Sequence, residues 1–233
     1  MKLTLRQCPF SPKNDVERKT KMFLEGIAQE DFVARIAREL QIGIEFPFIA
    51  PVTGEYPTSQ NFSKYRDMPY GETGTIGGAG CGPLAIEYSL RVMGIEVDFE
   101  DIVCECVGKG YRGYRYDEQD NIIGGCGTEN EVFDLAESLG SISRIIAALK
   151  KGYMVTVLVA NKVYHSDTAR SGNHFISLVG IDAEGNALFM DGNMITDVNR
   201  PEEAFVVRPF KYVATGFKGA WAWNPEKIME SLY

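Results

Sequence analysis

The chain has 233 residues, 45% of them hydrophobic, and its formal net charge at pH 7 is -8. This length and composition suit one large globular domain, or a domain with a sizeable extension. The negative charge, with no cluster of lysine and arginine, argues against a nucleic-acid partner, because phosphate binding needs a basic face. No apolar run approaches the ~20 residues that cross a bilayer, so we expect no membrane span.

The first residues, MKLTLRQCPFSPKNDVERK, lack the apolar centre and the small-residue cleavage site of a signal peptide. We therefore expect a cytoplasmic location. Five cysteines, an odd number with irregular spacing, fit a reducing compartment and free thiols. Cys104 and Cys106 lie too close together for a usual Cys-x-x-Cys zinc or redox site. The sequence thus leads us to assign no metal and no cofactor.

The N-terminal part of the chain has a helical pattern. Apolar residues over 14–40 fall near helical spacing, with a break at 26–31, which predicts a helical hairpin. The stretch FPFIAPVTGEYP that follows carries three prolines and cannot continue a helix. We therefore predict a helical extension over residues 1–50 and a core domain over 51–233, and the oligomeric state stays open.

Within the core domain, helices come first and strands later. The patterns predict helices over 83–93, 129–139 and 143–151, the last ended by Gly152. Short β-branched and aromatic runs, YMVTVLVA, HFISLVGI and NALFMDG, predict strands, and DAEGN between the last two is a good hairpin turn. This order predicts an α+β fold with a helical part packed on an antiparallel sheet.

Cys81 stands where a glycine-rich stretch becomes a helix, in GGAGCGPLAIEYSL. Unpaired N–H groups and the dipole at a helix start favour a negative charge such as a thiolate. Gly80 and Gly82 remove side-chain bulk, so that a substrate carbonyl could approach the sulfur, and Pro83 suits a first helical turn. This setting fits a nucleophile, although a small cysteine packed in the core would fit the same residues.

A cysteine nucleophile needs a base, and the chain has only two histidines. His174 begins an apolar strand, whereas His165 lies in the polar stretch NKVYHSDTAR, so His174 is the better candidate. The turn at 182–186 folds this strand back so that Asp191 can lie beside His174 and fix its tautomer. Gln60 or Asn61, in YPTSQNFSKY, is a candidate second donor for an oxyanion.

Three segments together resemble one known family: SQNFSKYRDMPYG, GGAGCGPLAIEYSL and GNHFISLVGIDAEGNALFMDG. Their order and spacing are similar to those of cysteine peptidases related to the double-glycine leader peptidases of bacterial bacteriocin exporters, a branch of the papain-like superfamily. The resemblance covers residues 56–195. It implies a papain-like fold with Gln60 as oxyanion donor, Cys81 as nucleophile, His174 as base and Asp191 as its orienting partner.

The chain departs from the family pattern at four places, namely Tyr65, Leu84, Asn173 and Gly192, none of which is a reacting group. The chain also lacks an exporter's membrane and ATPase segments, which indicates a stand-alone relative. We therefore expect a thiol hydrolase that cleaves a peptide or amide bond of a peptide or protein substrate. A transferase with the same residues and a non-catalytic peptide-binding domain are the alternatives.

Substrate contacts are assigned to residues around the cysteine and in one glycine-rich stretch. Gly80, Gly82 and Asn173 flank the predicted reacting groups. Residues 108–128, GKGYRGYRYDEQDNIIGGCGT, are rich in glycine, tyrosine and arginine, a composition typical of adaptable binding loops and also of a solvated surface loop. Arg112 or Arg115 could receive an acidic group of the substrate.

Overall fold

The structure is a computed structural model, which describes residues 4–5, 58–93, 95–108, 111–116, 118–119, 122–182, 185–197 and 200–231. The helical hairpin predicted over 14–40 lies outside the described residues. The helices are α3 (Ser63–Arg66), α4 (Ile76–Ala79), α5 (Cys81–Val92), α6 (Phe99–Gly108), α7 (Asn130–Phe133), α8 (Ile142–Lys150), α9 (Asn161–Tyr164), α10 (Lys211–Gly216) and α11 (Pro225–Ser231). The strands are β1 (Thr4–Leu5), β2 (Ile95–Glu96), β3 (Tyr111–Tyr116), β4 (Ile122–Gly127), β5 (Glu137–Ser138), β6 (Met154–Ala160), β7 (Asn173–Ile181), β8 (Asn186–Met190), β9 (Phe205–Pro209) and β10 (Phe217–Trp223).

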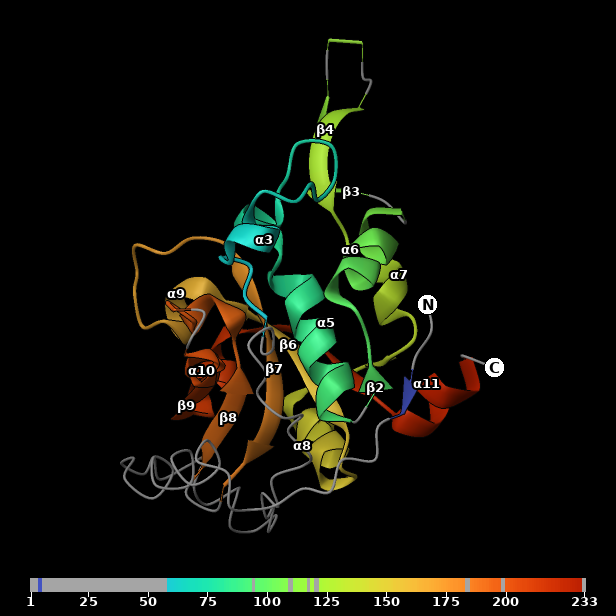
Figure 1. Cartoon of the computed structure of the whole chain (residues 1–233). Helices are drawn as coiled ribbons and strands as arrows, with labels where there is room; N and C mark the ends of the chain where they lie inside the picture. Colours follow the sequence, from blue (N-terminus) through green and yellow to red (C-terminus); the bar gives the residue numbers. More distant parts are fainter. Residues whose placement is uncertain are drawn as a thin grey trace.

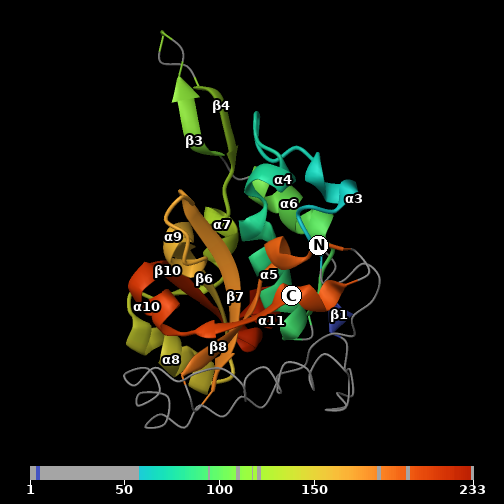
Figure 2. The ribbon, with the colours of Figure 1, turned by 90° about the vertical axis from the view of Figure 1, so that its left-hand side faces the viewer.

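A six-stranded antiparallel sheet organises the domain, with the strand order β5-β10-β6-β7-β8-β9. Both faces of this sheet are apolar, as the alternation along β7 shows. Phe175 and Val179 belong to the core cluster on the α5 side, whereas Ile176 and Leu178 belong to the cluster with α8 and α10. Figures 1 and 2 show α5 on one face of the sheet and α8 to α10 on the other. The fold is therefore α+β, as the sequence predicts.

Buried hydroxyl groups fix α5 against the sheet. Ser177 of β7 donates to the Ala85 carbonyl of α5 at 2.6 Å. Ser89, one turn further along the helix, lies 3.0 Å from Thr156 of β6 and 3.1 Å from Ser177, oxygen to oxygen. Buried polar groups of this kind are satisfied in one arrangement only, so they set both the rotation and the height of α5 above the sheet. That placement brings Cys81, the first residue of α5, to the end of the sheet where β7 begins.

The predicted helix over 83–93 is confirmed as α5, and the helix over 143–151 as α8, with Gly152 at φ +76° after it. The three predicted strands are β6, β7 and β8, and β7 and β8 form the predicted hairpin. The chain also forms α6, β9 and β10, which the sequence analysis does not predict.

The helix predicted over 129–139 is wrong beyond its first turn. Only α7 is helical there, and the chain then enters β5, where Ser138 pairs with Trp221 of β10. The ring of Phe133 stacks on Trp221 with centroids 4.2 Å apart. Pairing with the edge of the sheet thus overrides the local helical pattern, as tertiary contacts often do.

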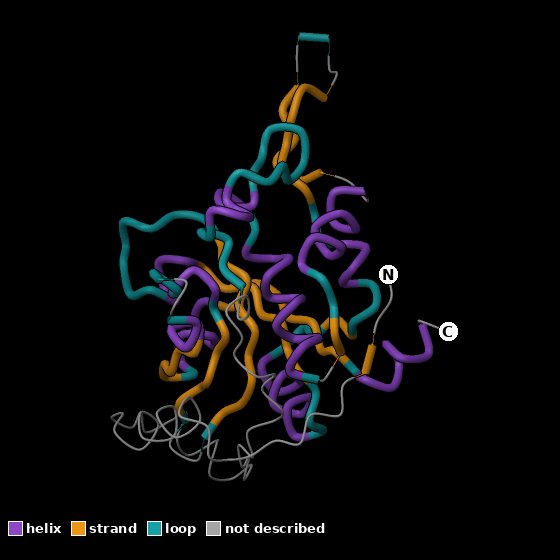
Figure 3. The backbone as a smooth tube through the Cα atoms, viewed as in Figure 1, coloured by secondary structure: helices purple, strands orange, loops and turns teal. Residues whose placement is uncertain are grey.

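The stretch 108–128 is not an irregular loop. Strands β3 and β4 form a two-stranded antiparallel hairpin, with irregular register between Arg112 and Tyr116. Figure 3 shows this pair of strands projecting beyond the rest of the molecule. The β-branched and aromatic residues in this stretch favour strands, whereas its many glycines are typical of the loop that the sequence predicts here.

The two described residues of the N-terminal segment belong to a small sheet. Thr4 pairs with Glu96 and Leu5 with Ile95, so β1 lies antiparallel to β2. Strand β2 follows the C-terminal end of α5, which is the end opposite Cys81 (Figure 1). Among the described residues, no helix is long and apolar enough to cross a bilayer.

Candidate active site

Cys81 is the first residue of α5 and is partly exposed. The single-turn helix α4 precedes it, and Gly80 ends α4 while its carbonyl accepts from the Leu84 N–H of the new helix. Because Cys81 is the first residue of α5, its N–H has no carbonyl of that helix to donate to. Among the described residues it donates to no other backbone carbonyl either. Cys81 therefore carries a thiol and an available N–H donor at one point.

His174 is buried at the start of β7, between Cys81 and Asp191. Its Nε2 lies 2.9 Å from Oδ1 of Asp191, and both side chains are almost fully buried. The N–H does not point straight at the oxygen, so the contact is an ion pair more than a linear hydrogen bond. Cys81 lines the same pocket as the imidazole and is close enough to help raise its pKa. Because Nε2 faces Asp191, Nδ1 is the nitrogen that serves the thiol.

The strand register explains how His174 and Asp191 meet. Ser177 of β7 pairs with Met190 of β8, so Asp191 comes level with Ile176, one pleat away from His174 on the same face of the sheet. The Asp191 carboxylate also accepts the Asn193 N–H at 3.0 Å as the chain turns after the strand. The hairpin therefore delivers the pairing that the sequence predicts.

The electrostatics of the pair favour its charged form. Burial by itself would lower the pKa of His174, but the Asp191 carboxylate and the Cys81 thiol outweigh it and raise that pKa to about 10. Burial would likewise raise the pKa of Asp191, yet the His174 imidazolium holds it below its usual value. At neutral pH the site thus holds a protonated imidazole next to a sulfur atom.

Gln60 lines the same small pocket as Cys81 and His174, together with Tyr88, Phe175, Met190, Leu84, Ala85, Asp191 and Gly192. Its Nε2 donates to the Gly77 carbonyl at 3.0 Å, which uses one of the two amide hydrogens. The second hydrogen is available to a ligand in the pocket. The neighbouring Asn61, the alternative donor, is exposed.

The segment before Gln60 is tied to both other parts of the site. Thr58 donates to the buried Glu87 carboxylate of α5 at 3.1 Å, and Tyr88 of α5 donates to the Thr58 carbonyl. Ser59 donates to the Gly192 carbonyl, just after Asp191, at 2.7 Å. A Cβ at Gly192 would come within 2.6 Å of the Tyr88 hydroxyl, which explains why this position has no side chain.

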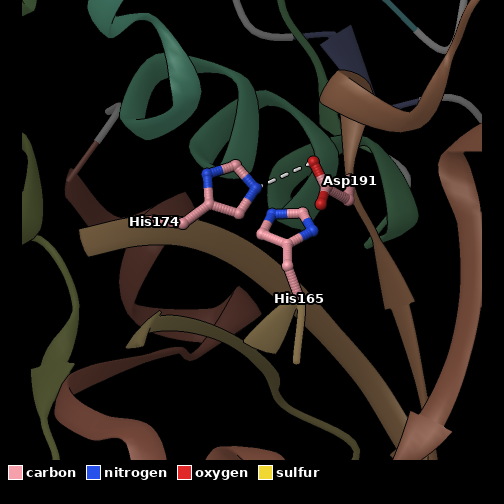
Figure 4. Close-up of side chains that lie close together, drawn as sticks. All are labelled: His165, His174 and Asp191. Carbon is pink, nitrogen blue, oxygen red and sulfur yellow. Dashed lines mark ion pairs between the residues drawn. The ribbon is translucent and has the colours of Figure 1, made fainter. Parts of the chain in front are cut away.

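His165 lies beside His174 and Asp191, which the sequence does not reveal. The two imidazole ring centroids are 5.8 Å apart, and one ligand atom from each of His165, His174 and Asp191 lies within 4.8 Å of the others. Figure 4 shows both rings turned toward the same carboxylate. Burial, with the positive charges of Arg170 and His174, lowers the pKa of His165 to about 4, so it is neutral at pH 7. Eight residues of loop and strand separate the two histidines, and no local pattern encodes their meeting.

The remaining predicted residues are placed as follows. A Cβ at Gly82 would come within 2.1 Å of the Glu129 carboxylate, and one at Gly80 within 2.6 Å of the Ile76 carbonyl, so both glycines are required by packing inside the protein. Asn173 is exposed at the start of β7, next to His174. Arg112 and Arg115 lie in β3 of the projecting hairpin. Substrate contacts by these five residues stay a prediction.

The Cys81 thiol, the His174 imidazole, the Asp191 carboxylate and the Gln60 amide line one pocket. No known family, curated protein or solved structure matches the chain. The chemistry of the site is therefore read from its own geometry. A nucleophile, a proton carrier with its orienting carboxylate and two N–H donors are what acyl transfer through a thioester requires.

Proposed function

We propose that the protein is a papain-like cysteine hydrolase that cleaves a peptide or amide bond through an acyl-enzyme thioester. The observation that carries the proposal is the position of His174, which pairs with the Asp191 carboxylate and shares a small pocket with the Cys81 thiol. The resemblance to double-glycine leader peptidases agrees with it. In that reading, the helix α5 packed on the antiparallel sheet is the centre of a papain-like fold.

In the first half of the reaction, the proton of the Cys81 thiol already resides on the His174 imidazole, and the Cys81 thiolate attacks the substrate carbonyl carbon. The oxyanion that forms accepts hydrogen bonds from the Cys81 N–H and from the free hydrogen of the Gln60 amide. As the C–N bond breaks, His174 gives its proton to the leaving amine. The raised pKa of His174 suits this step, because the imidazolium is held until the leaving group needs the proton.

In the second half, His174 removes a proton from water, and the hydroxide attacks the thioester carbonyl. The C–S bond breaks, the carboxylic acid product leaves, and the Cys81 thiolate is regenerated. If an amine enters instead of water, the same residues perform a transfer. Product analysis by mass spectrometry, with and without an added amine, separates hydrolysis from transfer.

Thiol reactivity tests the proposal without knowledge of the substrate. The protein is treated with substoichiometric iodoacetamide from pH 5 to 9, and the modified cysteine is found by peptide mapping. We expect Cys81 to be labelled first although Cys104 is more exposed, and we expect this preference to be lost in His174→Ala. Equal labelling of Cys81 and Cys104 at every pH would contradict the proposal.

A further inference from the structure

A second chemical capacity lies on the side of His174 that faces away from Cys81. His165, His174 and Asp191 come from the end of α9, the start of β7 and the end of β8, and each offers one ligand atom to a common point. Among the described residues this is the group that presents three such atoms within 4.8 Å of one another. Figure 4 shows the two imidazole rings and the carboxylate close together.

The donor set suits a borderline divalent transition metal. Two imidazole nitrogens and one carboxylate oxygen are common ligands of Zn²⁺ at about 2.0–2.2 Å, which puts neighbouring ligand atoms roughly 3.3 Å apart in a tetrahedron. The His174 Nε2 to Asp191 Oδ1 distance of 2.9 Å is already near that value. The third ligand atom, from the half-buried His165, lies within 4.8 Å of the other two and has to move closer to complete such a site.

Buried polar atoms gather at this point. His174 Nε2 has the Asp191 carboxylate as its ion-pair partner, and the Tyr164 hydroxyl interacts with Asp191 and Arg208, but His174 Nε2, Asp191 Oδ2 and the Tyr164 hydroxyl have no hydrogen bond of good geometry among the described residues. A bound cation would give these poorly aligned atoms a common partner. Arg208, whose guanidinium lies 5.0 Å from the Tyr164 ring centroid, and Arg170 add positive charge nearby, which weakens the binding of a cation.

We propose that His165, His174 and Asp191 form a binding site for a divalent transition metal of the Zn²⁺ type, and that an ion bound there switches off the thiol chemistry. The ion takes Nε2 of His174 and releases its proton to solvent. The neutral ring then keeps its remaining proton on Nδ1, so it cannot accept the proton of the Cys81 thiol. This inhibition rests on the proposed hydrolase function, whereas the metal binding itself does not.

Calorimetric titration with Zn²⁺ tests the site on the full chain carrying Cys81→Ala, because removing the thiol removes the obvious competing ligand. We expect one ion per chain. Adding His165→Ala should weaken binding by at least about tenfold. Adding Asp167→Asn is the matched control on the same loop, since this exposed carboxylate contacts Arg170 and not the site, and should leave affinity within about threefold.

Two outcomes would overturn the site: no binding to the Cys81→Ala protein, or binding that His165→Ala leaves unchanged.

The absorption spectrum of bound Co²⁺ is an independent test in the parent protein. A thiolate bound to Co²⁺ produces an intense near-ultraviolet charge-transfer band. We expect the visible ligand-field bands of bound Co²⁺ and no such charge-transfer band. Zn²⁺ binding with no effect on Cys81 alkylation would keep the site and reject its coupling to the thiol. Loss of alkylation selectivity without metal would instead reject the hydrolase proposal.

Discussion

Asp191 Oδ1 lies 2.9 Å from His174 Nε2, and this contact holds the imidazole with its other nitrogen toward Cys81. Asp191→Asn keeps the size of the side chain but removes its charge. We expect kcat to fall roughly 10²- to 10⁴-fold, because the imidazolium loses the charge that stabilises it and the ring loses its fixed tautomer. The melting temperature should change by a few degrees at most. Normal turnover in Asp191→Asn would remove this residue from the mechanism.

The two histidines are distinguished by substitution. His174→Ala should abolish turnover, as Cys81→Ala should, because among the described residues that line the pocket His174 is the one that can serve the thiol as a base. His165→Ala should keep at least about a tenth of the parent kcat, since His165 is neutral at pH 7 and reaches Asp191 but not Cys81 in the described geometry. Steady-state rates at pH 7 check this. Equal damage from both substitutions would show that the base is wrongly assigned.

Gln60→Ala removes one donor to the oxyanion and leaves the Cys81 N–H. Loss of one such donor costs about 10²- to 10³-fold in turnover, so we expect reduced but measurable kcat with KM changing less. Ser59→Ala is a matched comparison, because it leaves the Gln60 amide and removes the hydrogen bonds of the Ser59 hydroxyl, which donates to the Gly192 carbonyl and accepts the Asn61 N–H. A smaller kcat loss in Ser59→Ala than in Gln60→Ala is the expected order. The reverse order would make Gln60 a structural residue.

The strand hairpin and the helix start could be predicted because their signals are local. The turn DAEGN and the alternation along β7 and β8 are each recognised within a few residues, and they bring His174 and Asp191 together. The glycines before Cys81 mark the helix start, whereas Cys81 reaches the pair through the packing of α5 on the sheet. His165 could not be placed in this way. It lies after the short helix α9, whose position depends on packing against β6 and α10. The same holds for Glu129, whose contact with Gly82 comes from a distant segment.

The predicted helix over 129–139 and the predicted loop over 108–128 failed for a related reason. The stretch 129–139 forms β5 by pairing with the distant β10, and within 108–128 the strands β3 and β4 pair with each other. Strand formation depends on such partners more than helix formation does, because the hydrogen bonds are made between segments. Single-segment patterns therefore predict α5 and α8 well and short edge strands poorly.

Glu87 gives a prediction for stability against pH. Burial raises its pKa to about 7 from the model-peptide value of 4.5, although Arg91 and Thr58 oppose this. Its contribution to stability is thus full below pH 4.5 and is lost as the pH rises through 7, by on the order of 3 kcal/mol. Glu87→Gln cannot ionise. We expect its melting temperature, relative to that of the parent, to rise between pH 5 and pH 8.

The control for this prediction is Glu105→Gln, an exposed carboxylate on α6. Its melting curves should follow those of the parent across the same pH range. The absolute stability of Glu87→Gln also reflects the lost contact with Arg91, where Nε lies 3.1 Å from Oε1, so the slope with pH is the quantity to compare. Parallel slopes for Glu87→Gln and the parent would contradict the raised pKa.

The N-terminal segment gives the last prediction, and β1 directs it. Thr4 and Leu5 pair with β2, beyond the C-terminal end of α5, and a 12-residue helix puts that end about 18 Å from Cys81. We therefore expect a structural role for residues 1–50 and not a lid over the pocket. A chain starting at residue 51 should melt at a lower temperature, by about 2–4 °C for each kcal/mol lost, without a gain in kcat. A chain lacking only residues 1–5 should show part of the same loss, because it loses the β1 pairing. Thermal melts and steady-state rates on both chains decide the matter: faster turnover at an unchanged melting temperature in the chain starting at 51 would make the segment an inhibitory lid.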